Sequence, residues 1–205
     1  KERRLVDLAI GATNNFKWKG TDYNTFYDSD DDGEWVNRDD SNELLDWSSI
    51  DTAEQLFAEM TDPATGDPIL IGGRTLLVTP ANRFIAQRLV AATETRDTTN
   101  TNTVTVQPNP LAGMGIRPVA SALVYQRLQA ALSLAASVAK DVWFYGDPMK
   151  AFAYMENWPI TVLQSPTNSE AEFNQDIVVR YKASERGAAA VMQPRAWQQH
   201  RKASE

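Results

Sequence analysis

The sequence predicts a mixed α+β fold. Two segments, 48–61 and 80–89, have the three- and four-residue spacing of apolar residues that is typical of amphipathic helices. Two others, 74–78 and 142–145, are short apolar runs of the kind found in buried strands. With 205 residues, the chain is long enough to form one large domain or two small ones.

The composition excludes several functional classes. The chain has no cysteine and one histidine, His200, which excludes disulfides, thiolate zinc sites, cysteine nucleophiles and histidine-rich metal sites and disfavours a Ser-His-Asp triad. The net charge is −7, so we expect no surface that wraps nucleic acid over the whole molecule. No apolar run has the roughly 20 residues of a membrane span, and no signal-peptide pattern follows Lys1. Because the first residue is not methionine, we expect a processed or truncated part of a longer chain.

The N-terminal third is expected to hold two helices separated by an aromatic, acidic segment. Residues 2–12 have the spacing of the end of a helix, with Gly11 as its C-cap. Residues 14–46 contain six aromatic residues, too many for a disordered segment, so we expect an ordered extended segment whose rings dock on something. In the helix at 48–61, Ser48 or Ser49 is the expected N-cap.

The middle of the chain alternates between extended and helical patterns. Gly72-Gly73-Arg74 marks a tight turn rather than a phosphate loop, because the Gly-Lys-Ser/Thr ending that grips phosphate is absent. Thr79 is the expected N-cap of the helix that starts at Pro80. The predicted strands are 68–71, 74–78, 104–107 and 142–145, and a further helix is expected over 123–140, where Ala and Leu are abundant.

The C-terminal quarter is expected to be mainly extended. Residues 151–155, 159–164, 177–183 and 187–192 are the strand candidates, with the last two read as a hairpin that has a solvated face. The tail, 195–205, is polar and is expected to be frayed. His200 lies in this tail among basic residues, where an arm that touches a neighbouring chain or nucleic acid is a better interpretation than a catalytic role.

An acidic run gives an alternative hypothesis. Asp28, Asp30 and Asp32 alternate before Gly33, and Asp39 is the twelfth residue of this segment. The spacing approximates the calcium loop of an EF-hand, but Asp at the twelfth position is short and the flanks do not read as helices. A metal and nucleotide-sugar site of the glycosyltransferase kind needs an upstream nucleotide-binding domain that is not visible. The remaining interpretation is a solvated acidic loop.

Several stretches, in the same order, resemble the major capsid proteins of tailed bacteriophages. They are 62–80, 109–113, 147–160 and 177–191. The resemblance implies the Hong Kong 97-like fold, an α+β fold whose N-terminal arm and extended loop would precede this sequence. It also implies a peripheral-domain portion at 1–68, which holds the end of the spine helix, an axial domain at 69–176, and closing strands with the C-terminal tail at 177–205.

The same resemblance implies a structural role with no catalytic residue, cofactor or metal. The expected partner is the chain itself, in pentameric and hexameric capsomers of an icosahedral shell around double-stranded DNA, with portal, scaffold or maturation protease and decoration proteins as further partners. DNA contact would be nonspecific, no membrane would be bound, and the shell would assemble in the host bacterial cytoplasm to form the virion. The candidate assembly contacts are Arg180, Lys182, Glu185 and Arg186.

Two other functions stay open. A nanocompartment shell protein of the encapsulin kind would have the same fold but would enclose a cargo enzyme instead of a genome. A monomeric calcium-binding domain would use the segment Asp28–Asp39 and would change its stability with calcium.

Overall fold

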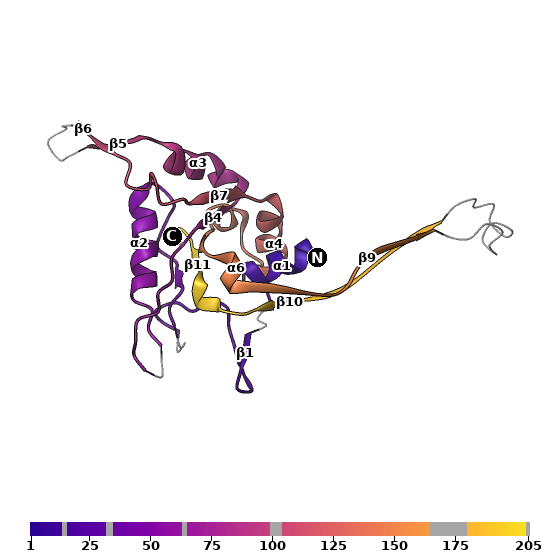
Figure 1. Cartoon of the computed structure of the whole chain (residues 1–205). Helices are drawn as coiled ribbons and strands as arrows, with labels where there is room; N and C mark the ends of the chain where they lie inside the picture. The colour runs from indigo at the N-terminus through magenta and orange to yellow at the C-terminus, as the bar shows by residue number, and fades with distance from the viewer. Residues whose placement is uncertain (14–15, 32–34, 63–64, 99–103, 165–179, 204–205) are drawn as a thin grey trace.

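The computed structural model describes residues 1–13, 16–31, 35–62, 65–98, 104–164 and 180–203. Figure 1 shows a body of helices and strands from which hairpins extend. In chain order the elements are α1 (Glu2–Ala9), β1 (Phe16–Trp18), β2 (Thr21–Tyr23), β3 (Arg38–Asp39), α2 (Trp47–Ala58), β4 (Thr75–Val78), η1 (Pro80–Asn82), α3 (Arg83–Ala91), β5 (Glu94–Thr98), β6 (Val104–Pro108), β7 (Arg117–Ala120), α4 (Ala122–Leu132), α5 (Ala136–Ala139), β8 (Trp143–Gly146), α6 (Pro148–Ala151), β9 (Phe152–Gln164), β10 (Tyr181–Val191), η2 (Pro194–Ala196) and β11 (Trp197–His200).

A five-stranded mixed sheet with the order β3-β11-β8-β4-β7 organises the body. β8 pairs antiparallel with both β4 and β11, whereas β4 with β7 and β11 with β3 are parallel pairs. All four residues of β8 are buried, because this central strand has a neighbour on each side and packed side chains on each face. The mixed sheet with flanking helices confirms the predicted α+β class.

Alternation along β8 divides the core into two layers. Trp143 and Tyr145 belong to a buried cluster that includes Ile50 and Phe57 of α2 and Leu89 of α3. Val142 and Phe144 belong to a second cluster, with Val124 and Leu128 of α4 and Trp197 of β11. Successive side chains of a strand point to opposite faces, so one short apolar run holds helices against both sides of the sheet.

The helix boundaries differ from the sequence prediction by a few residues. Asp46, not Ser48 or Ser49, caps α2, because its Oδ1 accepts a hydrogen bond from the backbone N–H of Ser48 at 2.8 Å. The predicted helix over 123–140 is divided into α4 and α5, and Ser133 has the left-handed φ of 54° that ends α4. The break lets Leu134 and Ala139 pack against the same cluster as α4.

Five strand predictions differ from the structure. Residues 68–71 form no strand, and only an isolated bridge joins Pro68 to Thr61. The candidates 151–155 and 159–164 are one continuous strand, β9, and the candidates 177–183 and 187–192 merge within the described residues into β10. β9 and β10 pair with each other rather than forming hairpins of their own, because pairing along the full length satisfies the backbone groups of both.

The C-terminal segment is the largest correction. It was expected to be a frayed basic arm, but residues 197–200 form β11, which lies between β3 and β8 and is buried throughout. His200 is fully buried and stacks on the ring of Trp143, with 4.3 Å between ring centroids. The prediction of a frayed tail was wrong because the side chains of this strand are polar, and burial of such groups depends on partners that lie far away in the sequence.

His200 has hydrogen-bond partners on both ring nitrogens. Nε2 lies 3.0 Å from Oε1 of Gln198, and Nδ1 lies 3.4 Å from the side-chain nitrogen of Asn42. A neutral imidazole that donates from Nε2 and accepts at Nδ1 fits this arrangement. Burial lowers the pKa of His200 to about 4, and the charge of Asp39 opposes that shift. The buried ring is therefore neutral at pH 7.

None of the helices in the described part of the chain is both long and apolar enough to cross a membrane.

The buried histidine predicts a loss of stability in mild acid. The unfolded His200 binds a proton near pH 6.5, whereas the folded one resists protonation until about pH 4, so acidification in this window favours the unfolded state. The loss between pH 7 and pH 4 should reach about 3 kcal/mol. Urea unfolding across this range, with wild type and the His200→Gln variant compared, measures it. Parallel pH profiles of the two proteins would contradict the assignment.

Candidate assembly interface

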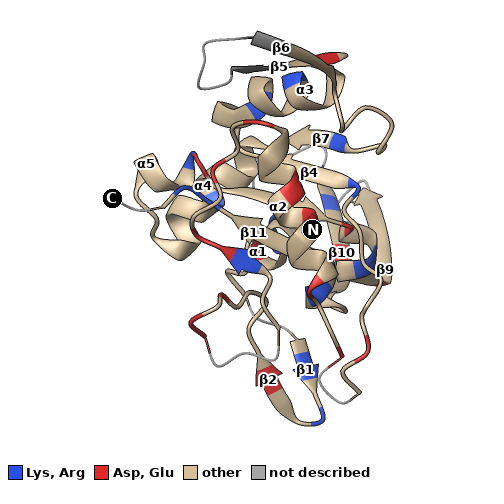
Figure 2. Cartoon of the chain, turned by 90° about the vertical axis from the view of Figure 1, so that its left-hand side faces the viewer, with Lys and Arg blue, Asp and Glu red and all other residues tan. Residues whose placement is uncertain are grey.

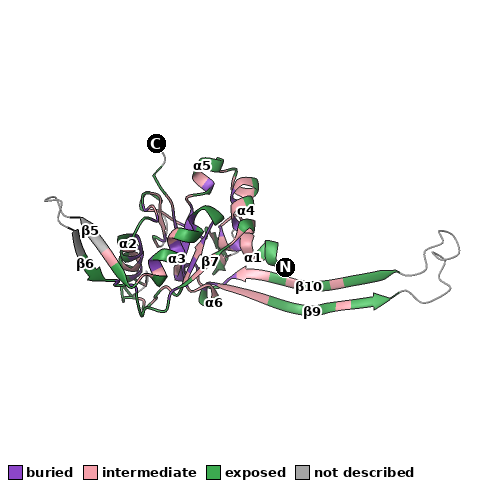
Figure 3. Ribbon diagram, turned by 90° about the horizontal axis from the view of Figure 1, so that it is seen from above, coloured by how far each residue is buried: buried purple, intermediate pink, exposed green. Residues whose placement is uncertain are grey.

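A long hairpin of β9 and β10 extends away from the body (Figures 1 and 3). β9 has 13 residues, which corresponds to about 43 Å of extended chain. The two strands pair antiparallel from Phe152 and Val191 at the root to Gln164 and Tyr181 at the far end. A two-stranded hairpin on its own is marginally stable in water, so we expect this one to be stabilised by contacts with other elements or with another chain.

Large apolar side chains on the hairpin face solvent. The register places Val162 on the strand face that also carries Ala183 and Tyr181, whereas Leu163 lies opposite Lys182 on the other face. Exposed apolar groups on this scale indicate an interaction surface. The exposed members are Met155, Trp158, Ile160, Val162, Leu163 and Tyr181, each with more than half of its surface accessible.

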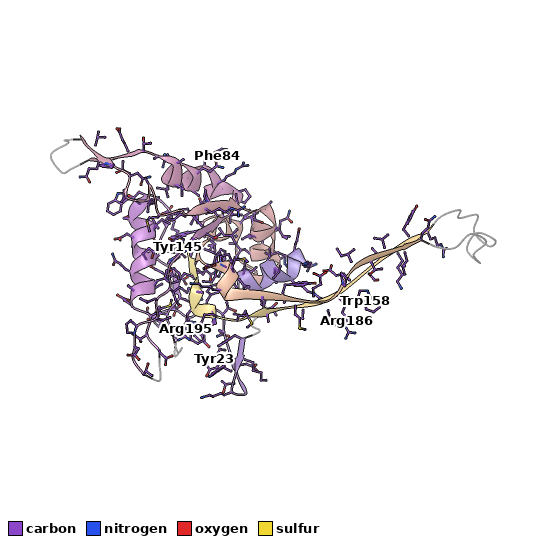
Figure 4. The ribbon with its side chains drawn as sticks, viewed as in Figure 1. Tyr23, Phe84, Tyr145, Trp158, Arg186 and Arg195 are labelled. Carbon is purple, nitrogen blue, oxygen red and sulfur yellow. The ribbon has the colours of Figure 1, made fainter. Side chains whose placement is uncertain are left out.

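Irregular pairing interrupts the middle of the hairpin. The register shifts between Ser184 and Arg186 and again between Arg186 and Gly187, so β9 contributes more residues than β10 to this region. Pro159 lies within the irregular part, where the missing N–H does not break a regular ladder. Extra residues in one strand bend it and increase its twist, and Figure 4 shows the hairpin turning beside Trp158 and Arg186.

Polar contacts from α1 hold the near half of the hairpin. Nζ of Lys1 lies 3.5 Å from Oε2 of Glu156 and 4.4 Å from the ring centroid of Tyr154. The Tyr154 hydroxyl donates to Glu185 at 2.9 Å, and this hydrogen bond to a carboxylate raises the pKa of Tyr154. Arg4 donates to the carbonyl oxygen of Gly187 at 3.3 Å. The contacts are exposed, so each contributes little stability by itself.

The four predicted contact residues all lie on or beside β10. Arg180 precedes the strand, Lys182 pairs with Leu163, and Arg186 pairs with Trp158, and all three are exposed. Glu185 is already engaged within the chain, because it accepts from Tyr154. Their contact with another subunit stays a prediction. The sequence reading missed the apolar residues of β9, although the alternation of Trp158, Ile160 and Val162 was the available signal.

The acidic run is only partly within the described residues. Asp32 and Gly33, which the EF-hand interpretation requires, lie outside them. Asp28 and Asp31 accept hydrogen bonds from backbone N–H groups of their own turn, and Asp39 accepts from Ser41. Among the residues that the structure describes, no group of three or more His, Cys, Asp or Glu could hold a metal ion.

Five of the six aromatic residues near this run pack against other rings, as predicted, whereas Trp18 is exposed. The rings dock mainly on one another beside the short β1–β2 hairpin. The ring centroids of Tyr27 and Trp35 are 5.3 Å apart, and those of Tyr23 and Trp35 are 5.7 Å apart. Phe26 instead packs against Phe144 in the core. Aromatic pairs at these distances add stability beyond the surface that they bury.

Comparison with known proteins identifies the family. A family described as "Phage capsid protein" matches residues 1–199. The chain belongs to the phage capsid protein family. No curated protein matches it.

Three solved structures are similar to this capsid protein. A capsid of an empty GTA particle matches with 14% identity over 63% of this chain and 38% of its own, at a TM-score of 0.36. A structure from Gordonia phage Cozz matches with 14% identity over 99% and 60%, at 0.48. A structure from Mycobacterium phage Ogopogo matches with 13% identity over 97% and 63%, at 0.42. The capsid protein thus spans less than two thirds of each of these chains. Because the TM-scores are below 0.5, the assignment rests on the family match.

Close packing beside the irregular middle of the hairpin predicts that Gly187 does not tolerate a side chain. A Cβ at this position would lie 2.3 Å from the Tyr154 hydroxyl and 2.9 Å from the carbonyl oxygen of Met155. The Gly187→Ala variant should therefore lose about 1–3 kcal/mol of unfolding free energy, measured by urea denaturation. Ala188→Ser, at the exposed neighbouring position, is the control. Equal stability of the two variants would contradict the described packing.

Proposed function

We propose that this chain is a structural major capsid protein, which self-assembles into capsomers and an icosahedral shell that encloses double-stranded DNA. The family match over residues 1–199 carries the proposal. A structural role requires no reaction centre, so we also propose that the chain is not an enzyme. The alternatives, an encapsulin-like nanocompartment shell and a monomeric calcium-binding domain, are not favoured by the family match.

The fold that we propose is the Hong Kong 97-like fold. A mixed sheet with helices on both faces and a long two-stranded hairpin are consistent with it. On this proposal residues 1–68 belong to the peripheral domain, 69–176 to the axial domain and 177–205 to the closing strands and tail. The five-stranded sheet takes β3 from the first of these ranges and β11 from the last, so the division describes a continuous body rather than separately folded units.

The proposed function requires that copies of the chain associate with one another. The hairpin exposes apolar side chains over its outer half, and a second copy of the chain is the partner that would cover them. Contacts that are weak individually suffice in a closed shell, because each subunit is held at several places at once. Arg180, Lys182 and Arg186 would then set the register of this contact through charge pairing at its rim.

The further partners are proposals that follow from the same role. They are the portal, scaffold or maturation protease, decoration proteins, and packaged DNA in nonspecific contact with the inner surface. The protein would assemble in the host bacterial cytoplasm and reside in the virion. The net charge of −7 suits limited contact with DNA, because like charges repel.

Sedimentation velocity with electron microscopy of the same sample tests the proposed function. The longest natural form of the chain, with and without calcium, should give closed shells or five- and six-membered rings. Nucleic acid inside shells purified from infected cells would support the capsid role, and an enclosed enzyme would support the nanocompartment. A monomer under all conditions would contradict self-assembly, and calcium-dependent stability in that monomer would favour the calcium-binding domain.

The hairpin surface predicts a specific assembly defect. The Ile160→Thr/Val162→Thr variant keeps β-branched residues in the strand but removes apolar surface, so the fold should persist while the concentration needed for assembly rises about tenfold or more. Light scattering against protein concentration measures this shift. Leu70→Thr/Met149→Thr is the control, since these side chains are exposed elsewhere on the body. An equal effect of the two double variants would contradict a role for the hairpin.

A further inference from the structure

One edge of the body carries three exposed arginines. Arg83 and Arg88 lie on the outer side of α3, and Arg117 begins the adjacent strand β7. All three are exposed, and none forms an ion pair within the described ranges. Phe84 (Figure 4) has 75% of its surface accessible, and the guanidinium carbon of Arg83 lies 6.0 Å from its ring centroid. We call these four residues the arginine edge. Arginine and aromatic side chains are the groups most enriched in protein interfaces.

The opposite edge of the same sheet carries the acidic run. Asp28, Asp30 and Asp31 follow Tyr27, whose carbonyl oxygen accepts 3.0 Å hydrogen bonds from the N–H groups of Asn37 and Arg38. These bonds place the run beside β3. We call the three aspartates the aspartate edge. Arg38 lies near enough for Asp28 and Asp31 to help raise its pKa, but its hydrogen bonds go to Asp40, and in the described part of the chain the three aspartates form no ion pair.

The strand order keeps the two edges apart within one subunit. β3 and β7 are the outer strands of the five-stranded sheet, and four strand spacings correspond to about 19 Å. Figure 2 shows α3 at one end of the body and the β1–β2 hairpin, after which the aspartates follow, at the other. Surfaces at opposite ends of one subunit can pair only between copies, and repeated head-to-tail pairing closes into a ring when the rotation permits.

Strand addition at the β7 edge is disfavoured, which leaves side chains to make the contact. The N–H groups of Arg117 and Ser121 point toward β4, where they donate to Arg74 and Val78. The backbone groups of the alternate residues, Pro118 and Ala120, therefore point away from β4, and Pro118 has no N–H to donate. A strand that paired with this edge would lack the hydrogen bond from Pro118. The arginine side chains beside the edge can still contact another chain.

We propose that the arginine edge of one copy binds the aspartate edge of the next copy and so joins subunits within a ring. The inference rests on the proposed self-assembly and names the surfaces that carry it. A second copy is favoured over DNA as the occupant, because the same chain presents a complementary acidic run at the matching end of its sheet. Phe84 would provide the apolar centre of the contact, with charges around it.

A charge-swap experiment on the full natural chain tests the pairing. The Arg83→Glu/Arg88→Glu variant and the Asp30→Lys/Asp31→Lys variant should each raise the concentration needed for assembly about tenfold or more, because like charges then meet across the contact. The variant with all four substitutions has the wild-type net charge and restores opposite charges, so it should assemble within about threefold of wild type. Sedimentation velocity at 50 mM and 300 mM salt, with circular dichroism as the folding check, gives the readout.

The outcomes separate the inference from the proposed function. The Arg3→Glu/Lys150→Glu variant has the same charge change elsewhere on the surface and serves as the control for net charge. Two outcomes would overturn the pairing if wild type still formed shells. One is normal assembly of the Arg83→Glu/Arg88→Glu variant, and the other is failure of the fourfold variant to recover assembly. Normal shells that lose DNA when Arg83 and Arg88 are reversed would overturn it in favour of a nucleic-acid contact. A wild-type chain that never assembles would contradict the proposed function itself.

Discussion

The antiparallel pairing of β8 with β11 is the constraint on which the rest of the structure depends. Gly146, the last residue of β8, lies opposite Trp197, the first residue of β11. The chain between them leaves the sheet and returns to the same place. The backbone N–H of Asp147 donates to the carbonyl oxygen of Ala196 at 2.9 Å, and that of Met192 donates to the carbonyl oxygen of Ala151 at 2.8 Å. These hydrogen bonds hold the two ends of the intervening segment together. The segment between β8 and β11, held at both ends in this way, extends outward as the hairpin of β9 and β10.

The same pairing explains how a polar C-terminal strand becomes core. Gln198 and His200 are fully buried, and an unpaired polar group in that position costs free energy. His200 lies between Gln198 and Asn42 and stacks on Trp143, which itself donates to the backbone of Asn42 at 2.9 Å. The edge strand β3 joins the sheet through this strand. β3 and β11, which lie far apart along the chain, are thus both needed to complete one body, and such a body fits the proposed role of a shell subunit.

Three surfaces of the described part of the chain are exposed and are available, on the proposed function, for contact with another copy. The hairpin exposes apolar side chains, the arginine edge exposes positive charge, and the aspartate edge exposes negative charge. Because the sheet places the two charged edges on its opposite outer strands, a head-to-tail contact can form without any rearrangement of the body. The irregular pairing in the hairpin, between Ser184 and Gly187 of β10, lies between the root and the regularly paired outer part that carries Val162. The proposed contacts at the outer half would therefore be made by a segment attached to the body at one end.

The sequence by itself determined the α+β class, the helix at 48–61, the start of the helix near Pro80 and the strands at 74–78 and 142–145, because each has a local period or cap that identifies it. The four charged residues at 180–186 were also chosen from a local pattern, and their contact with another subunit stays a prediction. Only the tertiary structure decided that residues 197–200 are a buried strand, that β9 is continuous through Pro159 and that the arginines and aspartates lie on opposite edges. The physical reason is the same in each case: the partner that satisfies the backbone or the buried side chain lies far away along the chain, and no local pattern encodes it.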